Sequence, residues 1–169
     1  MYVTIMRHHR WKEAVELLEE MIAGGSSDSV VTGPKISPSI VSYNAAITAC
    51  ARGRRFELAL ELLRGMRARS GISPDRYSYA AAMAGLAKAG KPTLALLLLE
   101  EMREAGLAPD MVCLSGAMDA CQTRGAWEEA GVVVEQVRYR EKDNRHASSP
   151  LRFFVLRTRY NIAFFLYSR

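Results

Sequence analysis

Residues 41–75 read VSYNAAITACARGRRFELALELLRGMRARSGISPD, and the pattern of this stretch recurs along most of the chain. It contains two short helical patterns, a basic turn between them and a Gly-Ile-Ser-Pro-Asp exit. Internal repeats of roughly 20 to 50 residues are typical of solenoids and other arrays, so they bear on the fold more than any single motif does.

The second helical pattern of each unit has small or apolar residues at positions i, i+1, i+3, i+4 and i+7. These positions form one broad stripe on a helix. The spacing occurs four times, beginning at Ala14, Ala59, Ala95 and Ala130 and ending at Met21, Met66, Met102 and Val137. The copies follow one another at steps of 45, 36 and 35 residues. Because the steps differ only in the loops, the same face is buried in every copy, as a stacked array of helical hairpins requires.

The first helical patterns align in the same register. Asn44, Ala80 and Ser115 are equivalent, and small residues such as Ala45 and Ala46 follow them. The distance between packed helices depends on the side chains at their contact, so these small residues predict close helix packing.

Glycine, proline and aspartate mark the ends of the helical patterns. The exits at 71–75 (GISPD) and 106–110 (GLAPD) each contain a Gly that can close a helix in left-handed geometry, a Pro that stops continuation and an Asp that can cap the next helix. Residues 24–38 (GGSSDSVVTGPKISP) are rich in Gly, Ser and Pro, which predicts a flexible insertion. Further glycines lie near the turns between paired helices, at Gly53, Gly90 and Gly125.

Composition limits the classes of protein to consider. Hydrophobic residues make up 49% of the chain, enough to bury a core. The formal net charge is +5, which permits a polyanionic partner without requiring one. Residues 1–10 lack the apolar core of a secretory signal. Residues 151–167 are apolar but interrupted by arginines, and are too short for a membrane span, so no membrane partner is expected.

No motif points to catalysis or to a metal. Cys50, Cys113 and Cys121 have no CxxC spacing, and we expect buried free thiols in a reducing compartment. His8 and His9 have no accompanying set of ligands, and a metal site needs three or four. The chain contains no phosphate loop, nucleophile elbow or zinc-deaminase signature. We therefore expect a protein that is not an enzyme, with no cofactor, no metal and no small-molecule substrate.

With these repeats the chain resembles the pentatricopeptide repeat family. The resemblance rests on Val41–Ile47 (VSYNAAI), on Glu61–Met66 (ELLRGM) and on the GISPD exit, and residues 79–110 repeat the pattern. It covers roughly residues 1–140. The tetratricopeptide repeat also forms helical hairpins, but its Trp-Leu-Gly-Tyr signature is absent here.

Repeat spacing and resemblance together predict an all-α fold, a right-handed superhelical array (an α-solenoid) of antiparallel helix-turn-helix repeats. The first unit would begin before residue 1, so the chain reads as a fragment, a truncated gene model or an unusual N-terminal half-repeat. The predicted units are 1–38, a partial repeat with a flexible loop insertion; 39–75 and 76–110, two repeats; 111–145, a degenerate repeat; and 146–169, a non-repeat tail or cap.

The resemblance implies binding of single-stranded RNA in a mitochondrion or chloroplast, with about one base read per repeat. It assigns three roles to residues of this chain. The first-turn readers are Asn44, Ala80 and Ser115, the residues that close a repeat are Asp75 and Asp110, and the residues that pack against a base are Val41, Tyr77 and Val112.

The family pattern also suggests base preferences. Asn44 with Asp75 resembles a reader of pyrimidines, uracil before cytosine. Ala80 with Asp110 departs from the pattern, because a methyl group forms no hydrogen bond with a base edge. Ser115 resembles a purine reader, with guanine expected, but its closing Asp is missing. Both aspartates are also expected to cap the following helix.

Basic residues recur near the interhelical turns. A one-sided row of them would bind phosphates and make binding salt-dependent, whereas the alternative is that a helix C-terminus favours cations. Tyr77 has an alternative too, packing against its neighbours. For the whole chain the alternatives are a helical scaffold that binds other proteins and a gene fragment without independent function. The basic residues are Arg52, Arg54, Arg55, Lys88, Lys91 and Arg124, with Arg7 and Arg10 upstream.

Overall fold

The computed structural model describes residues 11–25, 37–126, 128–133 and 135, most of which lie in helices. Within these ranges there is no strand, so the all-α prediction is confirmed. The predicted C-terminal tail, most of the loop insertion and the His8–His9 pair lie outside the described residues. Residues 128–133 are also helical. The labelled helices are α2 (Trp11–Gly25), α3 (Ile40–Arg52), α4 (Phe56–Ser70), α5 (Arg76–Ala89), α6 (Pro92–Glu104) and α7 (Met111–Arg124).

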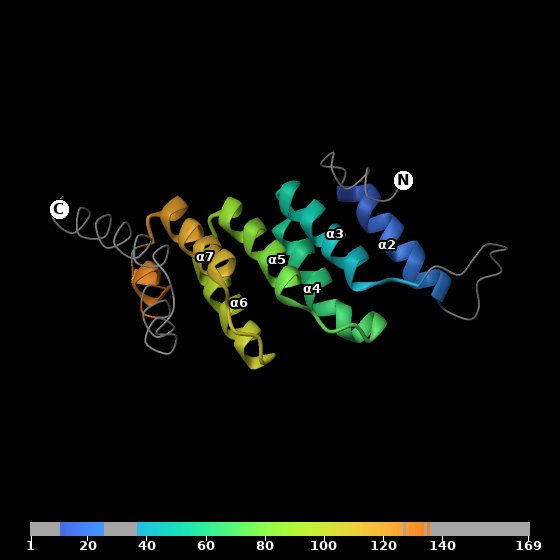
Figure 1. Cartoon of the computed structure of the whole chain (residues 1–169). Coiled ribbons are helices and arrows are strands. Elements are labelled where there is room, and N and C mark those ends of the chain that lie inside the picture. Colours follow the sequence, from blue (N-terminus) through green and yellow to red (C-terminus); the bar gives the residue numbers. More distant parts are fainter. Residues whose placement is uncertain (1–10, 26–36, 127, 134, 136–169) are drawn as a thin grey trace.

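The helices stack in chain order, from α2 on the right of Figure 1 to α7 on the left. Two hairpins, α3–α4 and α5–α6, occupy the middle of the array. The first helices pack on one another, α3 on α5 and α5 on α7, and each second helix packs on the first helix of the next unit. Packing between neighbouring units is what an α-solenoid requires, and the predicted solenoid is confirmed.

The apolar stripe of the second helices forms the core. Leu63 and Met66 of α4, and Leu99 and Met102 of α6, are fully buried. Burying such a side chain stabilises the fold by roughly 1.5–3 kcal/mol relative to leaving it exposed. Leu18 of α2 occupies the position of Leu63 and is buried as well.

The first helices approach one another through small residues. A Cβ added to Gly85 of α5 would lie 3.2 Å from the Cβ of Ala51 on α3, and one added to Gly116 of α7 would lie 2.7 Å from the Cγ of Met83 on α5. A larger residue at either place would force its neighbour to move. The close helix packing expected from the small residues is therefore confirmed.

The turns use left-handed residues, most of them glycine and one of them arginine. Gly71 and Gly90 close their helices at φ values of 66° and 60°. In the α3–α4 turn, Arg54 takes the position of Gly90 and has φ 57°, whereas Gly53 has φ −76°. Gly53 is needed for space instead, because an added Cβ would lie 2.5 Å from Cδ1 of Trp11.

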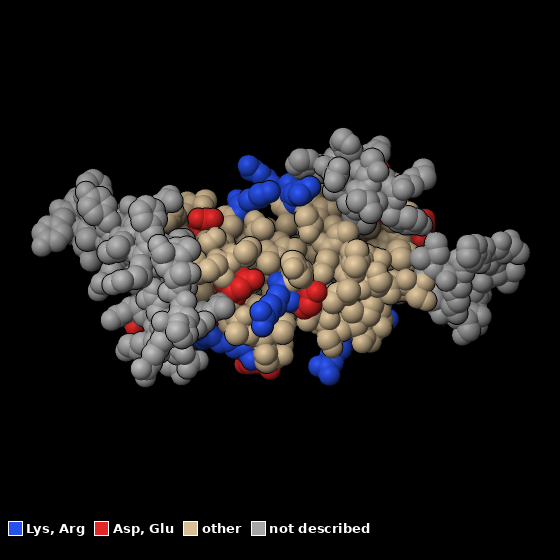
Figure 2. Space-filling view, in the orientation of Figure 1, with Lys and Arg blue, Asp and Glu red and all other residues tan. Residues whose placement is uncertain are grey.

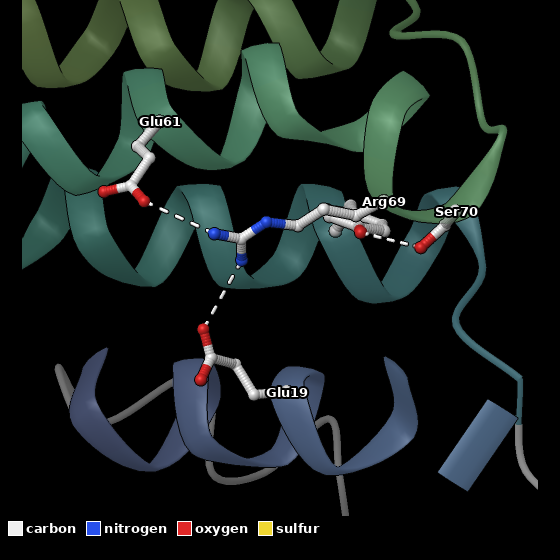
Figure 3. A network of polar contacts seen from close by, with 5 residues as sticks. Glu19, Glu61, Arg69 and Ser70 are labelled. Atoms are coloured by element: carbon white, nitrogen blue, oxygen red, sulfur yellow. Dashed lines mark hydrogen bonds and ion pairs between the residues drawn. The ribbon is translucent and has the colours of Figure 1, made fainter. Parts of the chain in front are cut away.

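Ion pairs connect the second helices of neighbouring units. Arg64 of α4 forms an ion pair with Glu101 of α6. Arg69 of α4 lies 3.4 Å from both Glu19 of α2 and Glu61 of its own helix, as Figure 3 shows. Exposed pairs of this kind contribute about 0–1 kcal/mol each, so core burial supplies most of the stability.

The three cysteines are buried free thiols, as predicted. Burial raises the pKa of Cys50 and of Cys121 to about 11, and that of Cys113 to about 12. Because the thiolate is the reactive form, these groups are unreactive near neutral pH.

Candidate nucleic-acid interface

Exposed apolar side chains lie at the start of the first helices. Val41, Tyr77 and Val112 are each the second residue of their helix, and they are 70%, 77% and 61% exposed. Because α3, α5 and α7 pack in sequence, the three side chains form a row, which we call the apolar row. The exposure of Tyr77 does not agree with the alternative in which it packs against its neighbours. Large apolar side chains exposed at equivalent positions of successive repeats are candidates for a binding surface.

The predicted base readers lie one helical turn further along the same helices. Asn44, Ala80 and Ser115 follow the members of the apolar row by three residues, so they lie on the same helix face. All three are partly buried. A ligand lying along the apolar row would therefore meet these positions at its edge.

Asn44 is held by Asp75, which closes its own unit, and by Ser78 of the following unit. Its Nδ2 donates to Oδ1 of Asp75 at 3.1 Å, and its Oδ1 accepts from Oγ of Ser78 at 2.5 Å. Ser78 is fully buried. The structure thus brings together Asn44 and Asp75, the pair suggested by the sequence, and adds Ser78 to them.

Asp75 also caps α5, as expected. Its Oδ1 accepts from the backbone N–H of Ser78 at 2.8 Å, and the backbone N–H of Asp75 donates to Oγ of Ser78 at 3.2 Å. This reciprocal arrangement is a capping box. Burial acts to raise the pKa of Asp75, but hydrogen bonds from Ser78 and Asn44 outweigh it and hold that pKa below its usual value. The carboxylate is therefore ionised at neutral pH and acts as an acceptor towards Asn44.

We call the place where a predicted reader meets the start of the next first helix a corner. The corner of the next unit lacks this network. Ala80 stands where Asn44 stands in the preceding unit, and Cys113 stands in the place of Ser78. Asp110 caps α7 by accepting from the backbone N–H of Cys113 at 2.9 Å, again as expected. The Ala80 methyl offers no donor or acceptor, so this unit has a cap but no polar reader.

Ser115 lies at the equivalent place on α7. The residues that would close its unit follow residue 135 and lie outside the described part of the chain. Its predicted preference for guanine stays a prediction.

Two of the predicted phosphate-binding residues contact aromatic rings of the preceding unit. The guanidinium carbon of Arg55 lies 4.9 Å from the ring centroid of Trp11, and Nζ of Lys91 lies 5.5 Å from that of Phe56. These are cation–π distances, and such contacts contribute about 0.5–1 kcal/mol at exposed sites. Arg55 and Lys91 occupy equivalent positions, so the contact repeats along the array.

The alternative for the basic residues is that a helix C-terminus favours cations. Arg124 agrees with it, because its Nε donates to the carbonyl oxygen of Gly90 at the end of α5, at 3.2 Å. Arg52, Arg54 and Lys88 are exposed and take part in no ion pair within the described ranges. Figure 2 shows basic side chains gathered along the upper edge of the molecule, over the α3–α4 and α5–α6 turns. This edge therefore has cations available for a negatively charged ligand.

The sequence interpretation missed Ser78. A signal was present, because Ser42, Ser78 and Cys113 each lie three residues after a helix cap, at capping-box spacing. That spacing says nothing of Asn44, which lies 34 residues before Ser78. The contact depends on the packing of α3 against α5.

Within the described residues, no group of His, Cys, Asp and Glu has an arrangement suited to a metal ion. No described helix combines the length and apolar character needed to cross a membrane.

Sequence comparison identifies matching repeats. A model of the PPR repeat family matches residues 38–88, and a PPR repeat model matches residues 6–26 and 77–107. Together the matches cover more than half of the chain. No curated protein matches it.

Solved structures of a pentatricopeptide repeat protein, PPR10, are similar to this one. PPR10 from maize has a TM-score of 0.65 at 26% identity over 93% of this chain. PPR10 in complex with an 18-nt psaJ RNA element has a TM-score of 0.63 at 27% identity over 91% of this chain. A triple Cys-to-Ser variant in complex with the same element has a TM-score of 0.63 at 26% identity. The present chain spans only 20–21% of the length of these proteins.

Proposed function

The chain belongs to the pentatricopeptide repeat family, and from this premise we propose that it binds single-stranded RNA along its first helices. The observation that carries the proposal is the apolar row, with the held amide of Asn44 one helical turn away. Repeats of this kind read about one base each through two or three side chains. The likeness to a pentatricopeptide repeat protein in complex with RNA supports the proposal.

A base is bound through its face and read through its edge. Base stacking on an aromatic side chain is worth roughly 1–3 kcal/mol per base. Tyr77 presents an exposed ring for it, and Val41 presents an exposed apolar surface against which a base can pack. Packed helices lie roughly 8–10 Å apart, which leaves room for one base plane between successive members of the apolar row. A base resting there presents its edge to Asn44.

The three readers differ in what they offer. The amide of Asn44 has donor and acceptor atoms and favours a pyrimidine, uracil before cytosine. Ala80 supports stacking without edge recognition, so its unit spaces the RNA. Ser115 favours a purine, with guanine as the proposed base.

Phosphates follow the basic edge of the molecule. Arg52, Arg54 and Lys88 have free charges and are the first candidates. Arg55 and Lys91 keep their charges while they lie over aromatic rings, so they add to the same field. Neutralised phosphates release counterions, and for single strands log K falls with log salt at about −0.7 per phosphate contact.

The site of action follows from the family. We place the protein in a mitochondrion or chloroplast, where it takes part in the processing, stability or translation of an organellar RNA. Imaging of the product of the full-length transcript, fused to a fluorescent protein, tests the location. A signal confined to the cytosol would contradict it.

The decisive experiment measures binding of fluorescent 12-nucleotide homopolymers of U, C, A and G to the full chain. We expect U12 to bind most tightly, and Asn44→Ala to weaken U12 binding about tenfold, equivalent to about 1.4 kcal/mol. Asn44→Ala with Asp75→Ala should lose the preference for U12 altogether. Glu100→Ala, an exposed change on α6, is the control and should bind as the parent does. Equal affinity of the parent and Asn44→Ala for all four oligonucleotides, with helical content retained, would rule out base reading.

The phosphate assignment has a separate test in salt. Arg52→Ala should reduce the slope of log K against log salt by about 0.7. Arg64→Ala removes a cation that is paired on the second-helix side, and it should leave the slope unchanged. An equal effect of both variants would argue against a basic edge that follows the RNA.

A protein-binding scaffold is the second candidate. Leu97 and Val132 stand at equivalent positions of successive second helices and are 46% and 48% exposed. They lie away from the apolar row, on the other helix of each unit. Binding of U12 that is unaffected by Leu97→Asp would separate this surface from RNA binding.

A further inference from the structure

We propose that Ser78 fixes the orientation of the Asn44 amide and thereby sets the choice between uracil and cytosine at that position. This inference rests on the proposed function. It makes base choice in one repeat depend on a buried hydroxyl supplied by the next repeat, so Ser78 is a positioning residue and not a base contact.

The two faces of the amide are distinguished by their neighbours. Asp75 is an ionised acceptor, and Nδ2 of Asn44 lies 3.1 Å from its Oδ1. Turning the amide over would place Oδ1 of Asn44 against this carboxylate, with two acceptors in contact and no proton between them. The carboxylate therefore selects the amide nitrogen.

Ser78 selects the amide oxygen. Its Oγ receives the backbone N–H of Asp75 at 3.2 Å, which uses a lone pair and leaves the hydroxyl proton to be donated. Two acceptors are within reach, Oδ1 of Asn44 at 2.5 Å and Oδ1 of Asp75 at 2.9 Å. Oδ1 of Asp75 already accepts from the backbone N–H of Ser78 and from Nδ2 of Asn44. The shorter contact, to Asn44, is therefore the one that takes the proton.

The fixed amide presents a directional edge. One N–H of Nδ2 and one lone pair of Oδ1 remain free, and their order is set by the two bonds already made. Uracil offers a ring N–H beside carbonyl oxygens, whereas cytosine offers a ring acceptor beside an amino group. Reversing the amide exchanges the positions of its donor and its acceptor. Uracil and cytosine bound at the same place are therefore distinguished only while the orientation of the amide is fixed.

Burial explains why the hydroxyl is effective. Ser78 is fully buried, so no water competes for its proton. The equivalent corner of the next unit has Cys113, a weak donor, beside Ala80, which has no amide to hold. The serine and the amide are thus present together where α3 meets the start of α5, and absent together where α5 meets the start of α7.

The test compares two serines that have the same capping role. Ser42 forms a capping box with Ser39, and its Oγ accepts from the backbone N–H of Ser39 at 3.4 Å, as Oγ of Ser78 accepts from that of Asp75 at 3.2 Å, but no described contact joins Ser42 to a base reader. Ser78→Ala and Ser42→Ala should both lower the melting temperature, Ser78→Ala by more, because it also removes the buried bond to Asn44. Only Ser78→Ala should reduce the ratio of the U12 and C12 affinities, by about 3- to 10-fold. Ser78→Thr retains a hydroxyl and should keep the parental ratio.

The experiment distinguishes a failure of the proposed function from a failure of this inference. Parent chain that binds neither U12 nor C12 would overturn the proposed function, whereas a parent that prefers U12 with an unchanged ratio in Ser78→Ala would overturn this inference alone. A readout without RNA is the exchange of the Asn44 side-chain amide protons, followed by ¹⁵N NMR. It should accelerate in Ser78→Ala and not in Ser42→Ala, and equal exchange in both would refute the positioning role.

The next unit allows the network to be built. Ala80→Asn alone supplies the amide, and Ala80→Asn with Cys113→Ser supplies the hydroxyl as well, beside the existing Asp110. We expect the double variant to gain about 3- to 10-fold in U12 affinity over Ala80→Asn. Equal U12 affinities and equal U12-to-C12 ratios in the two variants would count against a role for the hydroxyl.

Discussion

The hairpins α3–α4 and α5–α6 have matching cores and different corners. Leu63 in one and Leu99 in the other occupy the same position, and both are fully buried. Where the first helices begin, Asn44 is hydrogen-bonded to Asp75 of its own unit and to Ser78 of the following unit, whereas Ala80 has no polar side-chain atom.

The difference separates the positions that fold the repeat from the positions that we propose to read a base. The stripe on the second helix and the small residues on the first helix are kept in both units, so both units fold. Ala80 in place of Asn44 leaves the core of its unit intact. Under the proposed function, such a unit keeps its place in the array and spaces the RNA.

The largest expected effect tests whether the two cores are alike. Leu63→Ala and Leu99→Ala should each lower the free energy of unfolding by about 2–5 kcal/mol, because a buried cavity is left behind. Urea denaturation followed by circular dichroism at 222 nm measures both. If one variant lost several times as much free energy of unfolding as the other, the two cores would not be equivalent.

The caps should differ more than the cores. Asp75 accepts from the backbone and hydroxyl of Ser78 and from Asn44, whereas Asp110 caps its helix by accepting from the backbone N–H of Cys113. Loss of an N-cap costs about 0.5–2 kcal/mol, so Asp75→Ala should fall near the upper end and Asp110→Ala near 1 kcal/mol.

The same denaturation experiment measures the caps. Asp119→Ala, an exposed change within α7, is the control and should stay within about 0.5 kcal/mol of the parent. Equal losses in the two cap variants would mean that the extra hydrogen bonds of Asp75 add nothing.

Acid should weaken the hydrogen bonds that the Asp75 carboxylate accepts, and with them the stability of the fold. The pKa of Asp75 is lowered in the folded state, so its contribution to stability is full above the unfolded pKa, near 4, and is lost as the pH falls through the folded pKa. Thermal unfolding between pH 7 and pH 2 should show a shallower acid decline for Asp75→Asn than for the parent. Ser78→Ala should fall between them, because it removes part of the cause of the shift. An identical decline in stability with acid in the parent and both variants would contradict a contribution of the lowered pKa of Asp75 to stability.

The smallest expected effect concerns Arg54 in the α3–α4 turn. A left-handed conformation costs a residue with a side chain roughly 1–2 kcal/mol, so Arg54→Gly should raise the free energy of unfolding by about 1 kcal/mol while weakening U12 binding at low salt. Arg67→Gly, in the body of α4, should instead lower stability by about 1 kcal/mol. A rise in stability without weaker binding would remove Arg54 from the proposed phosphate edge.

Much of the fold could be predicted because the repeat encodes it locally. The spacing of Ala59 to Met66 predicted one buried face, and the exits with Gly71 and Asp75 predicted where one helix ends and the next begins. The α3–α4 turn could not be predicted in the same way. The sequence placed Gly53 near this turn, but the left-handed residue is the neighbouring Arg54, and Gly53 leaves room for Trp11, which packs against the turn.

The candidate site divides in a similar way. The sequence alone determined the register, and with it the positions of Val41, Asn44 and Asp75, because helical periodicity and capping act over a few residues. Only the tertiary structure decided which side chains meet. Ser78 reaches Asn44 because α5 packs on α3, and Arg55 lies over Trp11 because the next turn lies against α2. Contacts between residues tens of positions apart depend on the distance and angle between helices, which no local pattern specifies.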